Sequence, residues 1–168
     1  MEKKLIIIIN GGSGVGKSTL IKIAAGELMV RNVSSVSHVK EVAVCAGWNG
    51  VKDLPGRQLL TDLKQAMVTY DNSPYKAMVQ ELNIFMSGGE QVMFAHIHEP
   101  EEIKKFAQAV KDKGGKVVTL FVTRTTTGEL DLAQKEELAK SYDHVFANDK
   151  PIKESGPEFV KWLKEQIG

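Results

Sequence analysis

The sequence predicts an α/β protein with three layers, in which a central parallel sheet of five strands is flanked by helices. The first observation is Leu5–Ile9, a continuous run of apolar, β-prone residues that is typical of a strand covered on both faces. The second is the alternation of strand-like and helix-like segments along the whole chain, which favours a parallel sheet. The third is a glycine-rich turn directly after Leu5–Ile9, where a parallel sheet has its ligand crevice.

Four more strands are expected from short runs of β-branched and aromatic residues. Val33–Val39 alternates Val and Ser as a short strand does, and Gln91–Ile97 has the sequence QVMFAHI. Lys116–Thr123 has the sequence KVVTLFVT, and His144–Ala147 forms the last strand. Together with Leu5–Ile9 they complete the expected sheet.

Helices are expected between the strands, because apolar residues there recur every three or four positions. The first helix begins at Ser18, and a short second helix covers 40–46, with Cys45 as a small buried residue. The next expected helices cover 59–70, 74–86, 100–113 and 130–141. The last helix is expected to begin at Ser155, because Ser155 and Glu158 have the spacing of a capping box.

The 168 residues are enough for one domain with a full core, and we expect a single domain over 1–168. The formal net charge of +1 gives no overall field for nucleic acid or a membrane, so neither is an expected partner. The single cysteine excludes an internal disulfide, and the first apolar run is too short for a signal peptide or a membrane span. We therefore expect a cytoplasmic protein that is a monomer or a homodimer.

The segment Asn10–Leu20, NGGSGVGKSTL, has the spacing of a phosphate-binding loop between a strand and a helix. Its glycines allow backbone N–H groups to converge on phosphate oxygens. Lys17 adds a positive charge for the outer phosphates, and the hydroxyl of Ser18 suits Mg²⁺. A glycine-rich turn without a ligand is the alternative, and the full combination disfavours it. We therefore predict binding of ATP with Mg²⁺. The predicted nucleotide contacts are Gly12, Ser13, Gly14, Val15, Gly16, Lys17, Ser18 and Thr19, with Ser18 as the metal ligand.

Two large classes of protein with this loop are disfavoured. A switch GTPase carries Asp-x-x-Gly after a strand and Asn-Lys-x-Asp late in the chain, whereas 148–150 has the order Asn-Asp-Lys. Motor ATPases usually show an apolar strand that ends in Asp-Glu, whereas the corresponding segment here is QVMFAHIHE. The class that remains is that of small-molecule kinases.

Beyond the phosphate-binding loop, the chain resembles the nucleoside monophosphate kinase superfamily, and more closely its deoxynucleoside monophosphate kinase and phosphomevalonate kinase-like members. The resemblance covers most of the chain and rests on GGSGVGKS, on SSVSHVKEVA followed by GWNGVKDLPGRQLLTDLK, on HIHEPEEI and on SYDHVFAND. It implies a compact ATP-dependent kinase with an acceptor-binding insertion at about 40–87 and a short lid at about 123–131.

Phosphoryl transfer needs positioning and charge neutralisation more than covalent chemistry, which sets the expected roles. Lys17 and Arg124 would stabilise charge on the donor and transferring phosphates, although Arg124 is equally a solvated charge at a strand end. Arg57 would clamp an acceptor phosphate through two hydrogen bonds. Asp53 would orient the acceptor or a metal-bound water, or it would simply cap the helix that begins near Gly56.

His96 and His98 stand where the family pattern resembles Asp-x-Arg, with a carboxylate for Mg²⁺ and an arginine for phosphate. We expect both to line the substrate site, with His96 as a buried imidazole and His98 as a donor to phosphate. The same departure also fits a site that binds nucleotide without efficient catalysis, while a metal site at the pair lacks obvious further ligands. Asn148 and Asp149 are expected to hydrogen-bond the base or to shape a turn.

The preferred hypothesis is an ATP-dependent phosphotransferase that moves the γ-phosphoryl group to a small phosphorylated acceptor, above all a nucleoside or deoxynucleoside monophosphate. The alternatives are a nucleotide-binding regulatory module and a slow NTPase that acts on a macromolecular partner. Acceptor-dependent release of ADP separates the first hypothesis from the other two.

Overall fold

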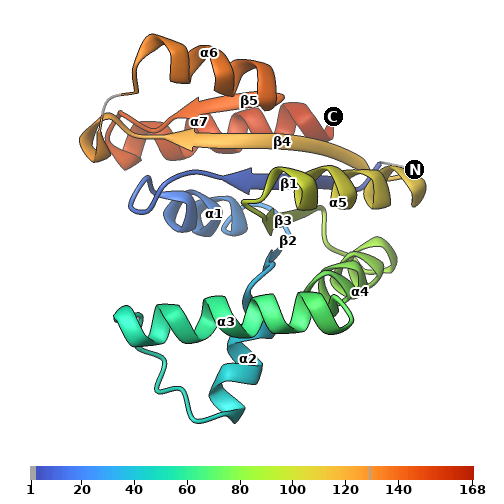
Figure 1. Ribbon diagram of the computed structural model, residues 1–168. Coiled ribbons are helices and arrows are strands. Elements are labelled where there is room, and N and C mark those ends of the chain that lie inside the picture. Colours follow the sequence, from blue (N-terminus) through green and yellow to red (C-terminus); the bar gives the residue numbers. More distant parts are fainter. Residues whose placement is uncertain (1–2, 129) are drawn as a thin grey trace.

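The computed structural model describes residues 3–128 and 130–168, so residue 129 of the expected lid lies outside the described residues. The strands are β1 (Leu5–Asn10), β2 (Val30–Ser34), β3 (Val92–His96), β4 (Lys116–Thr123) and β5 (His144–Ala147). The α-helices are α1 (Lys17–Ala25), α2 (Ser37–Cys45), α3 (Leu54–Tyr70), α4 (Ser73–Ser87), α5 (Pro100–Asp112), α6 (Leu132–Ser141) and α7 (Ile152–Ile167), and a 3₁₀ turn, η1, covers Thr125–Thr127. Figure 1 shows their arrangement.

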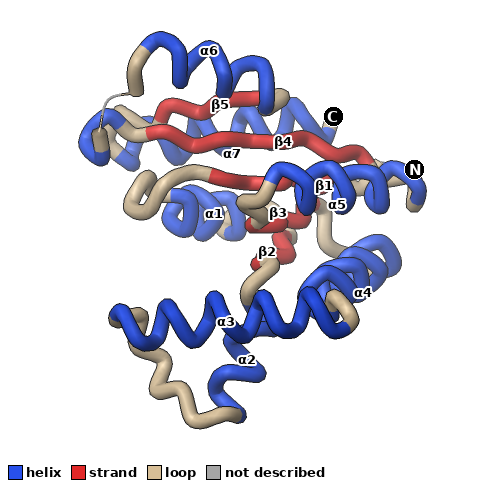
Figure 2. The backbone as a smooth tube through the Cα atoms, viewed as in Figure 1, coloured by secondary structure: helices blue, strands red, loops and turns tan. Residues whose placement is uncertain are grey.

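The strands form one parallel sheet in the order β2-β3-β1-β4-β5, drawn in red in Figure 2. β1 lies at its centre, where Ile9 is opposite both His96 of β3 and Leu120 of β4. The predicted α/β class and the central position of Leu5–Ile9 are therefore confirmed. The register also places the ends of β1 and β3 side by side, next to the phosphate-binding loop.

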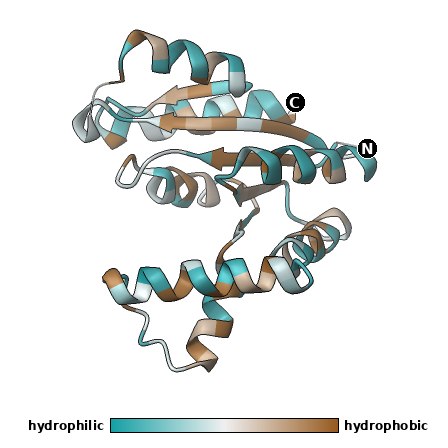
Figure 3. Ribbon diagram, in the orientation of Figure 1, coloured by the Kyte–Doolittle hydropathy of each residue, from teal (hydrophilic) through white to brown (hydrophobic). Residues whose placement is uncertain are grey.

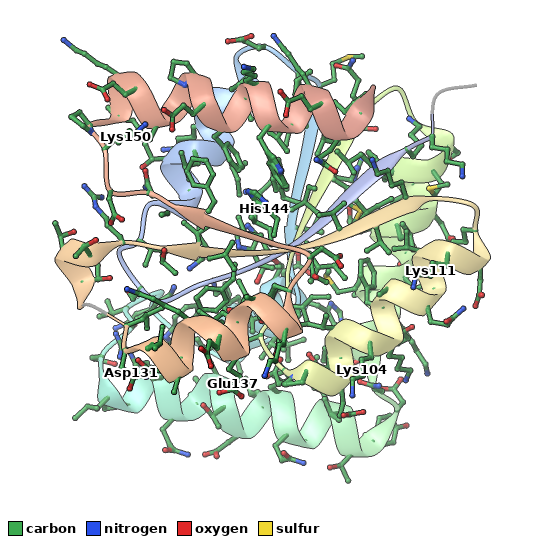
Figure 4. The ribbon with its side chains drawn as sticks, turned by 90° about the horizontal axis from the view of Figure 1, so that it is seen from above. Lys104, Lys111, Asp131, Glu137, His144 and Lys150 are labelled. Atoms are coloured by element: carbon green, nitrogen blue, oxygen red, sulfur yellow. The ribbon has the colours of Figure 1, made fainter. Side chains whose placement is uncertain are left out.

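Helices cover both faces of the sheet, as the continuous apolar run of β1 requires. All five residues of Leu5–Ile9 are 0% exposed. Leu5, Ile7 and Ile9 belong to one core with side chains of α1 and α7, whereas Ile6 and Ile8 belong to a second core with side chains of α4 and α5. Figure 4 shows α7 on one side of the sheet and α5 and α6 on the other, with Asp131 at the start of α6.

Helices α2, α3 and α4 pack against one another beyond the β2 edge of the sheet, in the lower part of Figure 1. α3 is the most exposed of the three, because Gly56 is its one buried residue. Figure 3 shows the consequence, since hydrophilic and hydrophobic positions are mixed along α3 while β1 and β4 are mainly hydrophobic. These helices occupy most of the expected acceptor-binding insertion.

The second strand and the second helix differ from the sequence prediction. β2 covers Val30–Ser34 rather than 33–39, and α2 begins at Ser37. The reason is that Val39 and Ala43, four positions apart, bury one face of a helix, and the valines at 33, 36 and 39 recur every three positions rather than every two. Cys45 is exposed, contrary to the prediction, because two positions beyond Ala43 correspond to a turn of about 200° around the helix.

α7 also begins earlier than predicted, at Ile152 with Pro151 as its N-cap. Ser155 therefore caps nothing; it is buried inside the helix, and its hydroxyl has no partner among the described residues. Its neighbour Gly156 packs closely on α1, since a Cβ added there would lie 2.9 Å from Cδ1 of Ile23. Packing against α1, rather than capping-box spacing, decides where α7 starts.

Candidate active site

The phosphate-binding loop connects β1 to α1 at the carboxyl edge of the sheet. Gly14 and Gly16 have φ of 78° and 95°, in the left-handed region that glycine adopts without strain. Gly16 is the N-cap of α1, so the loop ends on the free N–H groups of a helix N-terminus. Gly12 and Ser13 are exposed beside them. The loop thus has the backbone geometry of an anion-binding site.

Lys17 folds back over this loop. Its Nζ donates to the carbonyl oxygens of Gly11 at 2.6 Å and Gly12 at 2.9 Å. Burial lowers the pKa of Lys17 from its ordinary value, and a bound phosphate would oppose that shift by favouring the charged form. The ammonium is therefore held at the loop, where it would exchange neutral carbonyl oxygens for charged phosphate oxygens.

The other loop residues fall into two groups. Val15 is 4% exposed and packs into the core, so its backbone rather than its side chain faces the loop. Ser18 and Thr19 are exposed in the first turn of α1. No group of three or more His, Cys, Asp or Glu side chains that would hold a metal occurs in residues 3–128 and 130–168. Mg²⁺ needs few protein ligands, because it keeps several waters and binds phosphate oxygens, and the exposed hydroxyl of Ser18 fits that requirement.

The side chain of Asn148 supports the phosphate-binding loop from the protein interior. It is 3% exposed, and its Nδ2 donates to the backbone oxygen of Val15 at 2.8 Å. A Cβ added at Gly16 would collide with the same amide, so this position has no room for a larger residue. The side chain of Asn148 is thus engaged with the loop rather than turned toward a base.

Asp149 joins the end of β5 to η1. Its carboxylate accepts hydrogen bonds from the backbone N and from Oγ1 of Thr125, both at 2.6 Å. The hydrogen bond from the Thr125 hydroxyl, followed by that from its backbone, lowers the pKa of Asp149. Asp149 therefore holds the 3₁₀ turn η1 in the expected lid segment against the end of β5.

Arg124 lies beside the phosphate-binding loop and directly before η1. It is half-buried, and its Nη1 would be 3.9 Å from a Cβ placed on Gly16, so the guanidinium lies beside the loop. A cavity of about 320 Å³ adjoins it between the ends of β4 and β5 and helix α6. The residues that line the cavity are Thr123, Arg124, Thr125, Gly128, Leu130, Lys135, Leu138, Ala139, Val145, Ala147 and Asp149.

His96 and His98 flank the same loop at the end of β3. Nε2 of His96 lies 2.7 Å from Oδ1 of Asn32. Burial, with added effects of the charges on Lys17, His98 and Lys40, lowers the pKa of His96 to about 4. Burial and the charge of Lys17 also lower the pKa of His98. Both imidazoles are therefore neutral at neutral pH, close to the ammonium of Lys17.

Asn10 connects His98 to the loop and was not singled out by sequence reasoning. Its Oδ1 accepts from the backbone N of Gly11 at 2.8 Å and lies 2.5 Å from Nδ1 of His98. Its Nδ2 donates to the hydroxyl of Tyr142 at 2.9 Å. The ring of Tyr142 packs edge-on against Phe121. Its position as the last residue of β1 is the one signal in the sequence for this role.

The side chains of Asp53 and Arg57 form hydrogen bonds with the backbone at the start of α3. The carboxylate of Asp53 accepts from the backbone N of Gly56 at 2.8 Å, so the capping role is confirmed, although α3 begins at Leu54. Nε of Arg57 donates to the backbone oxygen of Lys52 at 3.0 Å, and Arg57 is exposed. Among the described residues, no hydrogen bond or ion pair joins either side chain to the phosphate-binding loop. The structure does not bring these two candidates together with Lys17.

Two lysines that sequence reasoning did not single out lie on helices α2 and α3. Nζ of Lys64 on α3 lies 2.7 Å from Oε1 of Glu99 and 3.5 Å from Oε2 of Glu102, which ties α3 to the start of α5. Lys40 of α2 is half-buried, and burial followed by the charge of neighbouring Lys52 lowers its pKa. The charge of Lys40 contributes to the lowered pKa of His96, and the charge of Lys64 contributes to the lowered pKa of His98.

Comparison with known proteins defines the fold and little beyond it. No protein-family model matches the chain, and no curated protein matches its sequence. Solved structures do match over nearly the whole length. A tunicamycin resistance protein from Deinococcus radiodurans is 12% identical, with a TM-score of 0.60 and coverage of 96% of each chain. APS kinase from Mycobacterium tuberculosis is 11% identical, with a TM-score of 0.54 and coverage of 98% of this chain and 99% of its own.

A gluconokinase from Sinorhizobium meliloti is 11% identical, with a TM-score of 0.52 and coverage of 99% of this chain and 94% of its own. The fold is therefore that of the P-loop kinases, and at these identities the likeness extends to the fold alone. In residues 3–128 and 130–168, no helix combines the length and the apolar character that crossing a membrane requires.

Proposed function

We propose that the protein is an ATP-dependent phosphotransferase that moves the γ-phosphoryl group of ATP to a small phosphorylated acceptor, with nucleoside and deoxynucleoside monophosphates as the first candidates. One observation carries the proposal: the two histidines at the end of β3 experience the charge of Lys17 of the P-loop and also the charges of Lys40 on α2 and Lys64 on α3. A donor bound at the loop and an anionic acceptor bound toward Lys40 and Lys64 would approach each other there.

Each part of the site would have a separate task. The loop N–H groups, the N-terminus of α1 and Lys17 would hold the donor phosphates, and Arg124 beside Gly16 would neutralise charge on the transferring group. Ser18 would hold Mg²⁺, which when bound screens the negative charge of the phosphates. The cavity of about 320 Å³ that Arg124 helps to line would accept the base.

The test is acceptor-dependent release of ADP. The protein is incubated with Mg-ATP and, separately, with each common nucleoside and deoxynucleoside monophosphate. The proposal expects ADP and a phosphorylated product with at least one of them, and only a background rate without acceptor. ADP release at one rate with every compound and without any would instead identify a slow NTPase.

A second candidate function is a nucleotide-binding regulatory module. The observation that favours it is that His96 is a neutral imidazole where the family pattern has a carboxylate. This function would give ATP binding in a titration together with no phosphoryl transfer to any acceptor. Turnover with an acceptor would exclude it.

A further inference from the structure

The hydrogen bonds around Asn10 determine which nitrogen of His98 carries the proton. The backbone N of Gly11 donates to Oδ1 of Asn10 at 2.8 Å, so this atom is an oxygen and accepts. His98 Nδ1, 2.5 Å from the same oxygen, must therefore donate to it. The amide nitrogen of Asn10 is consistent with this assignment, because it donates to the hydroxyl of Tyr142 at 2.9 Å. Nε2 of His98 is then left with a free lone pair.

His98 lies at the start of the phosphate-binding loop. Its Nδ1 is 2.5 Å from Oδ1 of Asn10, and the backbone N of Gly11 donates to the same oxygen. The carbonyl of Gly11 accepts from Nζ of Lys17 at 2.6 Å. The imidazole and the lysine that would hold the γ-phosphate are thus both joined by hydrogen bonds to the start of one loop, and the charge of Lys17 acts on His98.

The groups that face His98 keep it neutral. His98 is exposed to solvent, and its partial burial together with the charges of Lys17 and Lys64 lowers its pKa, while the charge of Glu99 beside it raises the pKa. His96 precedes it on β3 and is itself neutral, while Tyr142 reaches it through Asn10. A neutral imidazole whose Nδ1–H is already used cannot donate to phosphate, but it can accept a proton.

We infer that Nε2 of His98 is the general base for a hydroxyl group of the acceptor, and that Asn10 is the positioning residue that holds the base in the active tautomer. The inference rests on the proposed function and narrows it. An ionised phosphate is already a nucleophile and needs no base, whereas a hydroxyl must lose its proton as it attacks. The acceptor is therefore a small phosphorylated alcohol, and the product is a phosphate monoester rather than a diphosphate.

The step balances as follows. The hydroxyl oxygen forms a bond to the γ-phosphorus of ATP, and the bond from that phosphorus to the β–γ bridging oxygen breaks, so the electron pair leaves with ADP. The hydroxyl proton moves to Nε2 of His98 and is later released to water. The products are ADP, the phosphate monoester and one proton.

The first test does not depend on the acceptor. In protein labelled with ¹⁵N-histidine, NMR at pH 7 reports the protonation of each ring nitrogen. The inference expects His98 with a proton on Nδ1 and none on Nε2, and it expects Asn10→Ala to mix the two tautomers. A proton on Nε2 of His98 in the wild type would overturn the inference.

The second test identifies the bond that forms. Mg-ATP is supplied with nucleoside monophosphates and with their 2′,3′-dideoxy analogues, and ³¹P NMR distinguishes a new monoester from a diphosphate. The inference expects a monoester only from acceptors that keep a sugar hydroxyl. His98→Gln should reduce the rate of monoester formation by about 10²- to 10⁴-fold and remove the acid limb of the pH profile of that rate.

The control is His38→Gln, a half-buried histidine on α2 that pairs with Glu41 on the same helix, which should keep the wild-type rate. Formation of a diphosphate, or a wild-type rate and pH profile in His98→Gln, would overturn the inference and leave the proposed phosphotransferase intact. No acceptor-dependent ADP from any compound in the wild type would reject the proposed function, and the base with it.

Discussion

Asn148→Ala is the substitution that best separates a supporting residue from a base-binding residue. In the folded protein, Nδ2 of Asn148 donates to the backbone oxygen of Val15 at 2.8 Å, and the side chain is 3% exposed. Alanine leaves that carbonyl without its donor inside the protein, which costs about 1–3 kcal/mol. We therefore expect a loss of about 2 kcal/mol in the free energy of unfolding, which for a chain of this size lowers Tm by roughly 4–8 °C.

Urea unfolding monitored by circular dichroism measures this loss, and the matched control is Asn83→Ala, an exposed asparagine on α4. The control should change stability by less than about 0.5 kcal/mol. Because Asn148 supports the loop at Val15, ATP and GTP should both bind more weakly to Asn148→Ala, and by a similar factor. Unchanged stability together with an altered preference between ATP and GTP would refute this reasoning and restore Asn148 as a contact to the base.

Three further predictions concern the surroundings of the loop. His96→Gln should make the free energy of unfolding depend less on pH in acid. The folded-state pKa of His96 is lowered to about 4, so the wild type should lose up to about 3 kcal/mol as pH falls from about 6.5 toward 4. Equal urea midpoints of the two proteins across that range would contradict this. Lys64→Ala removes an ion pair with Glu99 that is partly exposed, so we expect a loss of about 1 kcal/mol or less at pH 7. Because the pKa of Glu99 is lowered, the difference should shrink as pH falls below about 4, and a difference that grows toward acid in urea titrations would be evidence against the pair. Arg124→Ala should lower acceptor-dependent ADP release by roughly 10³-fold with little change in Tm, and an unaffected steady-state rate would mark Arg124 as a solvated strand-end charge.

Much of the fold follows from local patterns. The apolar run Leu5–Ile9 is buried on both faces, and such a run fits the centre of a parallel sheet. The glycines of the loop have the left-handed conformations for which glycine is suited. Patterns of this kind depend on neighbours in sequence, so a single sequence is enough to recognise them.

Other features depend on residues that meet only after folding. The bond from Asn10 to Tyr142 spans 132 positions, and the contact from Asn10 to His98 spans 88. No periodicity marks such pairs in advance. For the same reason the sequence does not indicate that Lys64 of α3 pairs with Glu99 at the start of α5, 35 positions away.

The predicted ends of helices and strands were wrong where tertiary packing competed with a local sequence signal. Ser155 has a partner three positions on that suits a capping box, yet it lies inside α7 because Gly156 fits against Ile23. Val39 ends the segment 33–39 for which a strand was predicted, yet it is buried on α2. In each case the competing contact comes from a distant element, which a local pattern does not include.

The central claim is that this loop binds the phosphates of a nucleoside triphosphate under Lys17, and isothermal titration calorimetry with Mg-ATP tests it most directly. The wild type should bind one ATP, and Lys17→Ala should weaken binding by roughly 10- to 100-fold, because one hydrogen bond to a charged group is lost. Lys22→Ala, an exposed lysine further along α1, should bind as the wild type does. A wild type that takes up no ATP, or a Lys17→Ala variant with unchanged affinity, would contradict the claim.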